Sequence, residues 1–207
     1  MVTARRDHWE KAWQDRDATT TSWFQDLPVQ SLALMDAIGT QPSDPIIDIG
    51  GGQSRLVLAL VQRGHHDVSV LDIAQSALTG LDVDLTATLG RHRVTMITSD
   101  ILDWQPGRMY AVWHDRAVNH FLTSPTDRAA YVELARRAIR AGGHLILASF
   151  APDGPDKCSG LTVHRSDADS LAAEFSEHFD LVSVHHEVHQ TPWQAAQSFH
   201  YLVLKRR

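Results

Sequence analysis

The sequence predicts an α/β fold built on a doubly wound, mostly parallel sheet of seven strands. Three observations favour this fold class. Short apolar runs alternate with longer segments of helical periodicity between residues 46 and 150, which is the pattern of repeated βα units. The first apolar run, residues 46–50, ends in a row of glycines, which is typical of a strand that turns into a helix. Two final extended runs, 180–189 and 197–205, are joined by a short connection and so predict a terminal antiparallel hairpin.

Composition limits the expected compartment and partners. The chain has 207 residues, and we expect one domain over residues 1–207. Its net charge of −6 leaves no excess of cations to neutralise phosphates, so nucleic acid is not an expected partner. No apolar run approaches the roughly 20 residues that span a bilayer, and Met1 is not followed by a signal-peptide core. The single Cys158 excludes an intrachain disulfide. A cytoplasmic protein without membrane contact is the expectation.

Two helices are predicted ahead of the first strand, as an N-terminal helical cap over residues 1–40. The first covers Asp7 to Arg16, where apolar residues recur at helical spacing. The second begins near Pro28, a residue type favoured in a first helical turn, and stops at Gly39. Residues 46–207 would then form a Rossmann-like core.

The elements of this core are predicted from periodicity and turn residues. A helix begins at Pro125, carries Ile139 on its apolar face and is closed by Gly142-Gly143. The segment Ser166 to Asp169 resembles a capping box for the last helix. The other predicted helices are 54–63, 74–89 and 166–177, and the strands before the final pair are 46–50, 68–72, 93–98, 109–113 and 144–150.

The glycine turn after the first strand has the chemistry of a nucleotide site. Glycines let the backbone approach a ligand, and the N–H groups of the following helix face it at the carboxyl end of the strand. Gly50 and Gly52 fit the first two positions of G-x-G-x-x-G, but Arg55 stands at the third. Asp72 ends the next strand 20 residues after Gly52, where an acidic residue would hold ribose hydroxyls. A turn that merely joins strand to helix is the simpler alternative.

At these residues the sequence resembles the class I S-adenosylmethionine-dependent methyltransferases. Asp48-Ile49-Gly50-Gly51-Gly52 matches the family's D-x-G-x-G, and Asp72 matches the acidic residue that ends its second strand. The resemblance implies S-adenosylmethionine as cofactor, with Asp100 at the adenine amino group and Asp48 at the ammonium of the amino-acid tail. Turn capping by Asp48 and ordinary turn punctuation at Asp100 are the alternatives. The implied cofactor-binding residues are Asp48, Gly50, Gly51, Gly52, Asp72, Ile73, Asp100, Ile101 and His114.

Catalytic candidates follow the fourth predicted strand. The resemblance implies that His114 flanks the sulfonium of the cofactor. Methyl transfer is an in-line displacement, and a base is needed only if the nucleophile must lose a proton. Histidine titrates near neutrality, so His114 and His120, with Asp115 close by, are the candidates. Alternatively, Asp115 and Arg116 form an ion pair that holds the segment, and the histidines are spectators.

Residues for an acceptor pocket are expected in the loop 151–161 and in the N-terminal cap. Asp153, Cys158 and His164 could line such a pocket, although Cys158 could equally be a packed cysteine. Trp23 is either a substrate contact or, like Trp9 and Trp13, a core anchor of the cap.

The histidine-rich run near the C-terminus contains side chains that could bind a metal. His185, Glu187 and His189 share one face of a predicted strand, which is a legitimate ligand geometry. A hairpin strand with one solvated face would look the same, and the H-E-x-x-H spacing is absent. We therefore expect no metal.

The function predicted from these features is methyl transfer from S-adenosylmethionine to an O, N or S nucleophile of a small molecule. The N-terminal tryptophans with Ser22-Trp23-Phe24 also resemble eukaryotic lysine methyltransferases, so a protein acceptor is the alternative. A nicotinamide-dependent reductase is disfavoured by Arg55 at the third glycine position. A non-catalytic cofactor-binding protein stays open.

Overall fold

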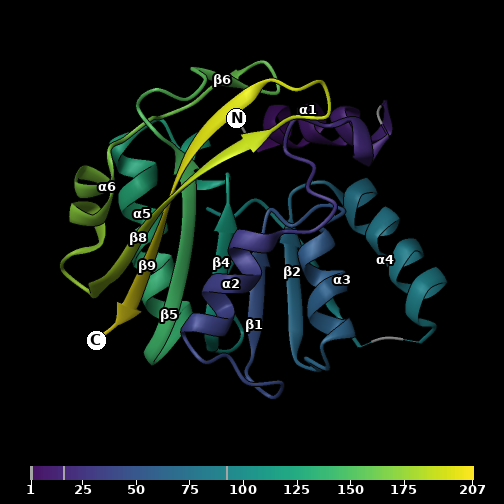
Figure 1. Ribbon diagram of the computed structural model, residues 1–207, viewed down its shortest axis with the longest axis horizontal. Helices are drawn as coiled ribbons and strands as arrows, with labels where there is room; N and C mark the ends of the chain where they lie inside the picture. The colour runs from purple at the N-terminus through teal and green to yellow at the C-terminus, as the bar shows by residue number, and fades with distance from the viewer. Residues whose placement is uncertain (1, 16, 92) are drawn as a thin grey trace.

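A seven-stranded mixed sheet forms the centre of the computed structural model, which describes residues 2–15, 17–91 and 93–207 (Figure 1). The strand order is β3-β2-β1-β4-β5-β9-β8; the pairs from β3 through β5 are parallel, and β9 is antiparallel to both of its neighbours. The predicted doubly wound sheet with a terminal hairpin is thereby confirmed. Arg16, the predicted end of the first helix, lies outside the described residues.

The elements have the following bounds. The helices are α1 Val2–Gln14, α2 Val29–Ala37, α3 Arg55–Gln62, α4 Gln75–Leu89, α5 Pro125–Ala138 and α6 Ala168–Phe175, with 3₁₀ turns at Ala18–Thr20 and Asn119–Phe121. The strands are β1 Ile46–Ile49, β2 Val68–Asp72, β3 Thr95–Thr98, β4 Tyr110–Arg116, β5 Ile139–Phe150, β8 Phe179–Gln190 and β9 Ala196–Arg206, with a separate two-stranded hairpin, β6 Lys157–Cys158 and β7 Leu161–Thr162.

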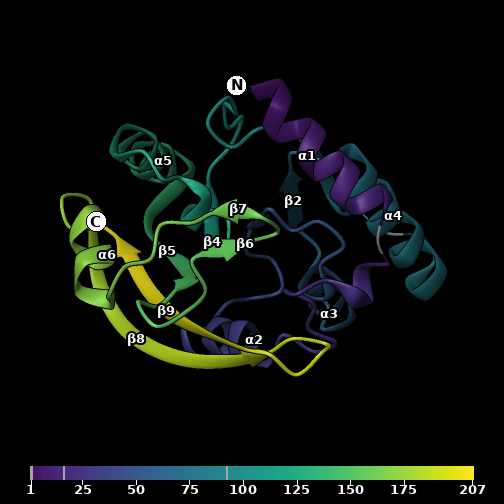
Figure 2. The same ribbon diagram turned by 90° about the horizontal axis from the view of Figure 1, so that it is seen from above.

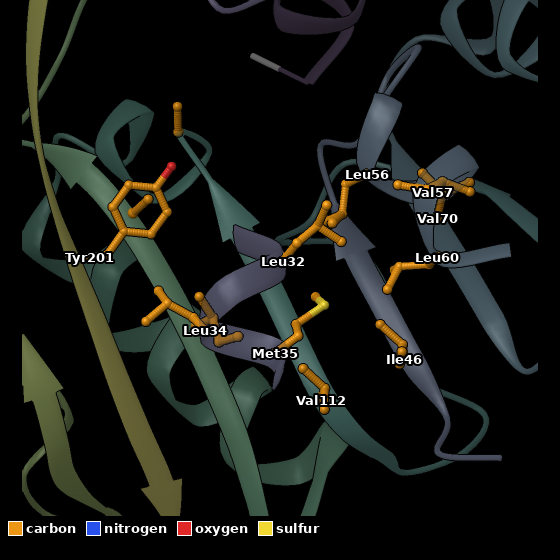
Figure 3. Packing of buried hydrophobic residues seen from close by; sticks show 14 of the residues in the cluster. Leu32, Leu34, Met35, Ile46, Leu56, Val57, Leu60, Val70, Val112 and Tyr201 are labelled. Atoms are coloured by element: carbon orange, nitrogen blue, oxygen red, sulfur yellow. The ribbon is translucent and has the colours of Figure 1, made fainter. Parts of the chain in front are cut away.

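Two apolar layers cover the two faces of the sheet. On one face, α2, α3 and α4 pack against the strands; Figure 3 shows Leu32 and Met35 of α2 and Leu60 of α3 turned towards Ile46 of β1 and Val112 of β4. On the other face, α5 and α6 bury a second layer with several aromatic residues. Because β1 is covered on both sides, all four of its residues are buried, as a parallel strand requires.

Several element boundaries differ from the prediction, and helix α1 begins at Val2 rather than at Asp7. Strand β4 continues through Arg116 instead of stopping at Trp113, since Asp115 pairs with Ile49 of β1 and with Leu147 of β5. Helix α5 ends at Ala138, and Ile139 already begins β5 opposite Tyr110, with an irregularity in the register before His144. Gly142 and Gly143 are therefore part of an extended segment and do not close the helix.

Smaller differences concern β3 and the loop after β5. Strand β3 begins at Thr95, two residues later than predicted, and the loop 151–161 contains the hairpin of β6 and β7.

The strand order places a crevice at the carboxyl ends of β1 and β4. The chain winds outwards from β1 through β2 to β3, and then returns to β4 on the other side of β1. At such a switch point the connections diverge and leave room for a ligand. Figures 1 and 2 show α1 lying across this end of the sheet, close to α4, so the N-terminal helix forms a roof above the crevice.

Candidate functional site

Asp48, near the end of β1, is the first polar residue of the site. It is 3% exposed, and its Oδ1 lies 2.7 Å from Nδ1 of His114, its register partner in β4. The other ring nitrogen of His114, Nε2, lies 2.9 Å from Oγ of Ser31 in α2. Oδ2 of Asp48 is buried and has no hydrogen-bond partner among the described residues. One carboxylate oxygen is thus fixed by the protein, and the other is left for a donor from elsewhere.

Asp72, at the end of β2, holds the glycine turn in place. Its Oδ2 accepts a hydrogen bond from the Gly52 N–H at 2.9 Å, and its Oδ1 accepts one from the Ala74 N–H at 2.8 Å. Burial raises the pKa of Asp72 to about 6, although these backbone donors favour the ionised form. The carboxylate therefore connects the ends of β1 and β2 at the point where both strands stop.

The glycines of the turn are required by close neighbours as well as by backbone conformation. Gly50 and Gly52 have φ of 62° and 51°, which favours glycine. A Cβ on Gly51 would lie 2.8 Å from Oδ2 of Asp48, whereas a Cβ on Gly52 would lie 2.4 Å from Cζ2 of Trp13. The indole of Trp13, from α1, therefore covers Gly52, while Gly51 keeps the space beside the free oxygen of Asp48.

Two cavities meet at this turn. The first, of about 80 Å³, is lined by Asp48, Gly51, Ser31 and His114, and we call it the Asp48 cavity. The second, of about 120 Å³, is lined by Asp72 and by the ends of β2 and β3, and we call it the Asp72 cavity. Both cavities are lined by Trp13, Trp23, Gly50 and Arg116, which form their junction. The Asp72 cavity is also lined by Ile73, Asp100, Ile101, Trp9, Phe121 and Cys158.

Helix α1 closes the Asp72 cavity from above. Nε of Arg5 lies 3.5 Å from Oδ2 of Asp100, and the other oxygen of Asp100 accepts the N–H of Leu102 at 3.0 Å. Glu10 accepts hydrogen bonds from the N–H groups of Gln75 and Ser76 in the first turn of α4. Burial alone would raise the pKa of Glu10, but hydrogen bonding to Ser76 and Gln75 outweighs it and lowers that pKa. An anion at a helix N-terminus is favourable, so this contact fastens the roof to the core.

Aromatic rings connect the roof to the turn after β4. The ring of Trp9 lies edge-on to Trp23 and to Phe121, with centroid distances of 5.8 and 5.2 Å, and Trp13 meets Trp23 at 5.8 Å. These four side chains pack on each other, as anchors of the cap would, and they also line the cavities.

The structure argues against Asp115 and His120 as groups that touch a substrate. Asp115 is fully buried and accepts hydrogen bonds from the N–H groups of Val118 and Asn119 and from the Tyr131 hydroxyl. Burial raises its pKa to about 6. It is thus a cap for the turn after β4, and the ion pair with Arg116 that was the alternative is absent from its described contacts.

His120 is enclosed by aromatic rings. It is 0% exposed, and its ring lies 4.4 Å from that of Phe121 and 4.7 Å from that of Phe150, centroid to centroid. Neither ring nitrogen has a hydrogen-bond partner in the described part of the chain, and burial lowers its pKa to about 3. Neither His120 nor Asp115 lines either cavity, whereas His114 does.

The predicted substrate residues fall into two groups. Trp23 and Cys158 line the Asp72 cavity, and burial raises the pKa of the Cys158 thiol to about 11. Asp153 is exposed and lines neither cavity. His164 also lies outside both linings; its Nε2 is 2.8 Å from Oγ of Ser166 and 4.0 Å from Oε1 of Glu174. The hairpin of β6 and β7 therefore brings only its cysteine to the cavity.

Arg116 is the residue that sequence reasoning missed. Its Nη1 donates to the carbonyl of Trp23 at 2.9 Å, its Nε donates to the Tyr201 hydroxyl at 3.1 Å, and its guanidinium lies 4.9 Å from the ring centre of Phe199. It lies two residues after His114 on the same strand, so both face the same side of the sheet. That alternation was visible in W-H-D-R, but the neighbouring aspartate suggested an ion pair instead.

The histidine-rich strand β8 holds the Trp23 loop. Glu187 accepts hydrogen bonds from the Gln25 side chain at 2.9 Å and from the Tyr201 hydroxyl at 2.8 Å, and Nε2 of His189 lies 2.8 Å from the carbonyl oxygen of Ser22. No cluster of three metal-ligating side chains occurs within residues 2–15, 17–91 and 93–207. None of the helices described there is long and apolar enough to cross a membrane.

No protein-family model and no curated protein matches this sequence. Solved structures do match it. A magnesium protoporphyrin IX methyltransferase from Synechocystis PCC 6803 with bound S-adenosylhomocysteine superposes with a TM-score of 0.78 at 16% identity, covering 100% of this chain and 99% of that one. The 1,6-didemethyltoxoflavin-N1-methyltransferase of Burkholderia thailandensis gives a TM-score of 0.77 at 18% identity over 99% of this chain and 88% of its own.

The N-methyltransferase NodS of Bradyrhizobium japonicum WM9, in complex with S-adenosylhomocysteine, gives 0.70 at 13% identity over 97% and 99% of the two chains. At such identities the likeness concerns the fold. The chain has the fold of the class I S-adenosylmethionine-dependent methyltransferases.

Proposed function

We propose that the protein is an S-adenosylmethionine-dependent methyltransferase whose acceptor is an O, N or S nucleophile of a small molecule. The observation that carries this proposal is the free oxygen of Asp48. A buried carboxylate oxygen without a donor is costly, and this one borders Gly51 at the switch point of the sheet. An ammonium group from a ligand would supply the missing donor, and the amino-acid tail of S-adenosylmethionine carries one.

The rest of the crevice fits the rest of this cofactor. Asp72 lies one strand away from Asp48, and each of its oxygens can accept a ribose hydroxyl in addition to the backbone N–H that it already binds. The lining of the Asp72 cavity continues to Ile73, Asp100 and Ile101, where adenine would lie. Gly50 lines both cavities, so its backbone would lie beneath the middle of the ligand.

When bound, S-adenosylmethionine supplies a methyl group on a positively charged sulfur. The chain's own contribution is to align the nucleophile with that methyl group in a crevice that α1 shields from water. We assign His114 to positioning, because both of its ring nitrogens are engaged and one of them fixes Asp48. We assign Asp115 to shaping the turn after β4, and we give His120 no contact with the reacting atoms.

Calorimetric titration with S-adenosylhomocysteine tests this function. Asp48→Asn keeps the size of the side chain but removes its charge, so we expect affinity to fall by about thirtyfold or more, as when a hydrogen bond between charged groups is lost. Glu177→Gln is the matched control, since the Glu177 side chain is 84% exposed, follows α6 and lines neither cavity. Wild-type protein that does not bind S-adenosylhomocysteine would end the proposal.

The kind of acceptor is tested separately with tritiated S-adenosylmethionine. The purified protein is incubated with a cell extract, which is then divided by size. We expect label in the small-molecule fraction. Label confined to protein would instead support a lysine methyltransferase, and tight binding without transfer to either fraction would support a cofactor-binding protein.

A further inference from the structure

Arg116 occupies an unusual electrostatic position at the junction of the two cavities. Its guanidinium has a carbonyl, a hydroxyl and an aromatic ring as neighbours, and no described carboxylate lies within 4.0 Å of it. Its third nitrogen, Nη2, is buried and lacks a hydrogen-bond partner among the described residues. A guanidinium taken out of water ordinarily needs an anion to offset its lost hydration.

The neighbouring thiol and hydroxyl do not supply that anion. Burial raises the pKa of the Cys158 thiol to about 11 and that of the Tyr201 hydroxyl to about 12, so both are neutral at physiological pH. Glu187 accepts a hydrogen bond from the Tyr201 hydroxyl that also accepts from Arg116, so its carboxylate lies within about 6 Å and offsets part of the charge. No described carboxylate reaches Nη2 of Arg116, which keeps an unused hydrogen-bond donor.

The acidic residues of the crevice lie farther along the sheet. Asp72 ends β2, which is separated from β4 by β1, so its backbone is about 10 Å from that of Arg116 at the usual strand spacing. Asp100 follows β3, one strand farther, and is faced by Arg5. Asp48 already faces His114. The unpartnered Nη2 of Arg116 is therefore the donor that an anion at the junction would meet.

The neighbouring walls are flat and apolar. Trp9, Trp23 and Phe121 line the same cavity as Arg116, and Cys158 lies among them. Trp9 meets both Trp23 and Phe121 in T-shaped contacts, and all three rings line the cavity, which favours contact with an aromatic ligand. The Trp23 carbonyl holds Arg116, so the wall and the cation are fixed together.

We propose that Arg116 binds an anionic oxygen of the methyl acceptor, and that the acceptor is a planar aromatic or heteroaromatic acid packed against the cavity wall that Trp9, Trp23 and Phe121 form. This assignment rests on the proposed function, because it takes the Asp72 and Asp48 ends of the crevice to be filled by the cofactor. It disfavours a lysine side chain as acceptor, since an ammonium beside Arg116 would be repelled.

Fluorine NMR with matched probes tests the assignment. 4-Fluorobenzoate and 4-fluorobenzamide have nearly the same shape but differ in charge, and each is titrated into the full chain with and without S-adenosylhomocysteine. Wild-type protein should bind the benzoate at least tenfold more tightly than the amide, as expected for a charge-assisted hydrogen bond. Arg116→Met should abolish this preference, both with and without S-adenosylhomocysteine. Arg140→Met is the control, because Arg140 pairs with Asp44 at the opposite end of the sheet; it should keep the preference.

Three results would overturn the assignment: no benzoate preference in wild-type protein, a preference that survives in Arg116→Met, or a tenfold loss of S-adenosylhomocysteine affinity in that variant. The last would place the carboxylate of the cofactor, not the acceptor, on Arg116. Should Arg116→Met not fold, Arg116→Lys decides, because it keeps the charge but loses the fork geometry; benzoate affinity should then fall three- to tenfold, and unchanged benzoate affinity would overturn the assignment. If wild-type protein binds no S-adenosylhomocysteine, the proposed function fails. The titrations of the two fluorinated probes in the absence of S-adenosylhomocysteine would still decide whether Arg116 binds an anion.

Discussion

Oδ1 of Asp48 lies 2.7 Å from Nδ1 of His114, and the two residues stand directly opposite each other in β1 and β4. This pair fixes a carboxylate at the switch point of the sheet. Ser31 engages the other ring nitrogen of His114, so the ring is held at both ends.

Replacing His114 should therefore affect binding as well as turnover. In His114→Gln the side-chain amide can reach only one of the two partners, which leaves a buried oxygen of Asp48 or Ser31 unpaired. We expect the free energy of unfolding to fall by roughly 1–3 kcal/mol and S-adenosylhomocysteine affinity to fall severalfold, measured by chemical denaturation and calorimetry. Unchanged affinity with lost turnover would instead make His114 a catalytic base.

Asp72→Asn tests the link between the two strand ends. The amide that replaces one carboxylate oxygen cannot accept from the N–H of Gly52 or Ala74. We expect a loss of tenfold or more in S-adenosylhomocysteine affinity, because a charge-assisted hydrogen bond to the ribose is lost and the turn is loosened. Affinity equal to that of wild-type protein would contradict the assignment of Asp72 as the residue that binds the ribose.

Gly51→Ala tests whether the free oxygen of Asp48 is reached from the turn. The added methyl group would lie 2.8 Å from that oxygen and 2.4 Å from Cγ2 of Val70. We expect cofactor binding to fall by a hundredfold or more by the same titration. Gly107→Ala is the control, since a Cβ there meets nothing within 4 Å. An alanine tolerated equally at both positions would show that no ligand approaches Asp48 from this side.

His120→Phe should stabilise the protein, and more so in acid. The folded-state pKa of His120 is about 3, below the ordinary 6.5, so folding favours the neutral ring. The free energy of unfolding is therefore highest above pH 6.5 and decreases as the pH falls towards 3. Phenylalanine removes this dependence and the two unpaired nitrogens. Denaturation should show a gain of about 1 kcal/mol at pH 8 and about 2 kcal/mol more at pH 5. Equal gains at both pH values would mean that His120 stays hydrated.

The fold was predictable because its signals are local. Each βα unit carries its own apolar periodicity, and the glycine turn with Asp72 identifies the ligand end of the sheet. The end of β4 was not predictable in this way. Asp115 in sequence is indistinguishable from a turn residue, and only pairing with β1 and β5 extends the strand through it. Ile139 likewise fits a helix face or a strand equally well.

The site was predictable in part for the same reason. Asp48, Gly50 and Asp72 are close in the motif and meet at one edge of the sheet. The partners of Arg116 are Trp23 and Tyr201, which are 93 and 85 residues away, so nothing near Arg116 reveals its position. Residue type also fails to separate a cavity-facing histidine from a packed one, as His114 and His120 demonstrate.

A crystal structure with S-adenosylhomocysteine tests the central claim most directly. The account predicts that the amino group of the ligand donates to Oδ2 of Asp48 and that its ribose hydroxyls reach Asp72, with the sulfur facing the junction at Arg116. A nucleoside bound elsewhere, or a crevice that stays filled by Trp13 in the presence of saturating ligand, would contradict it.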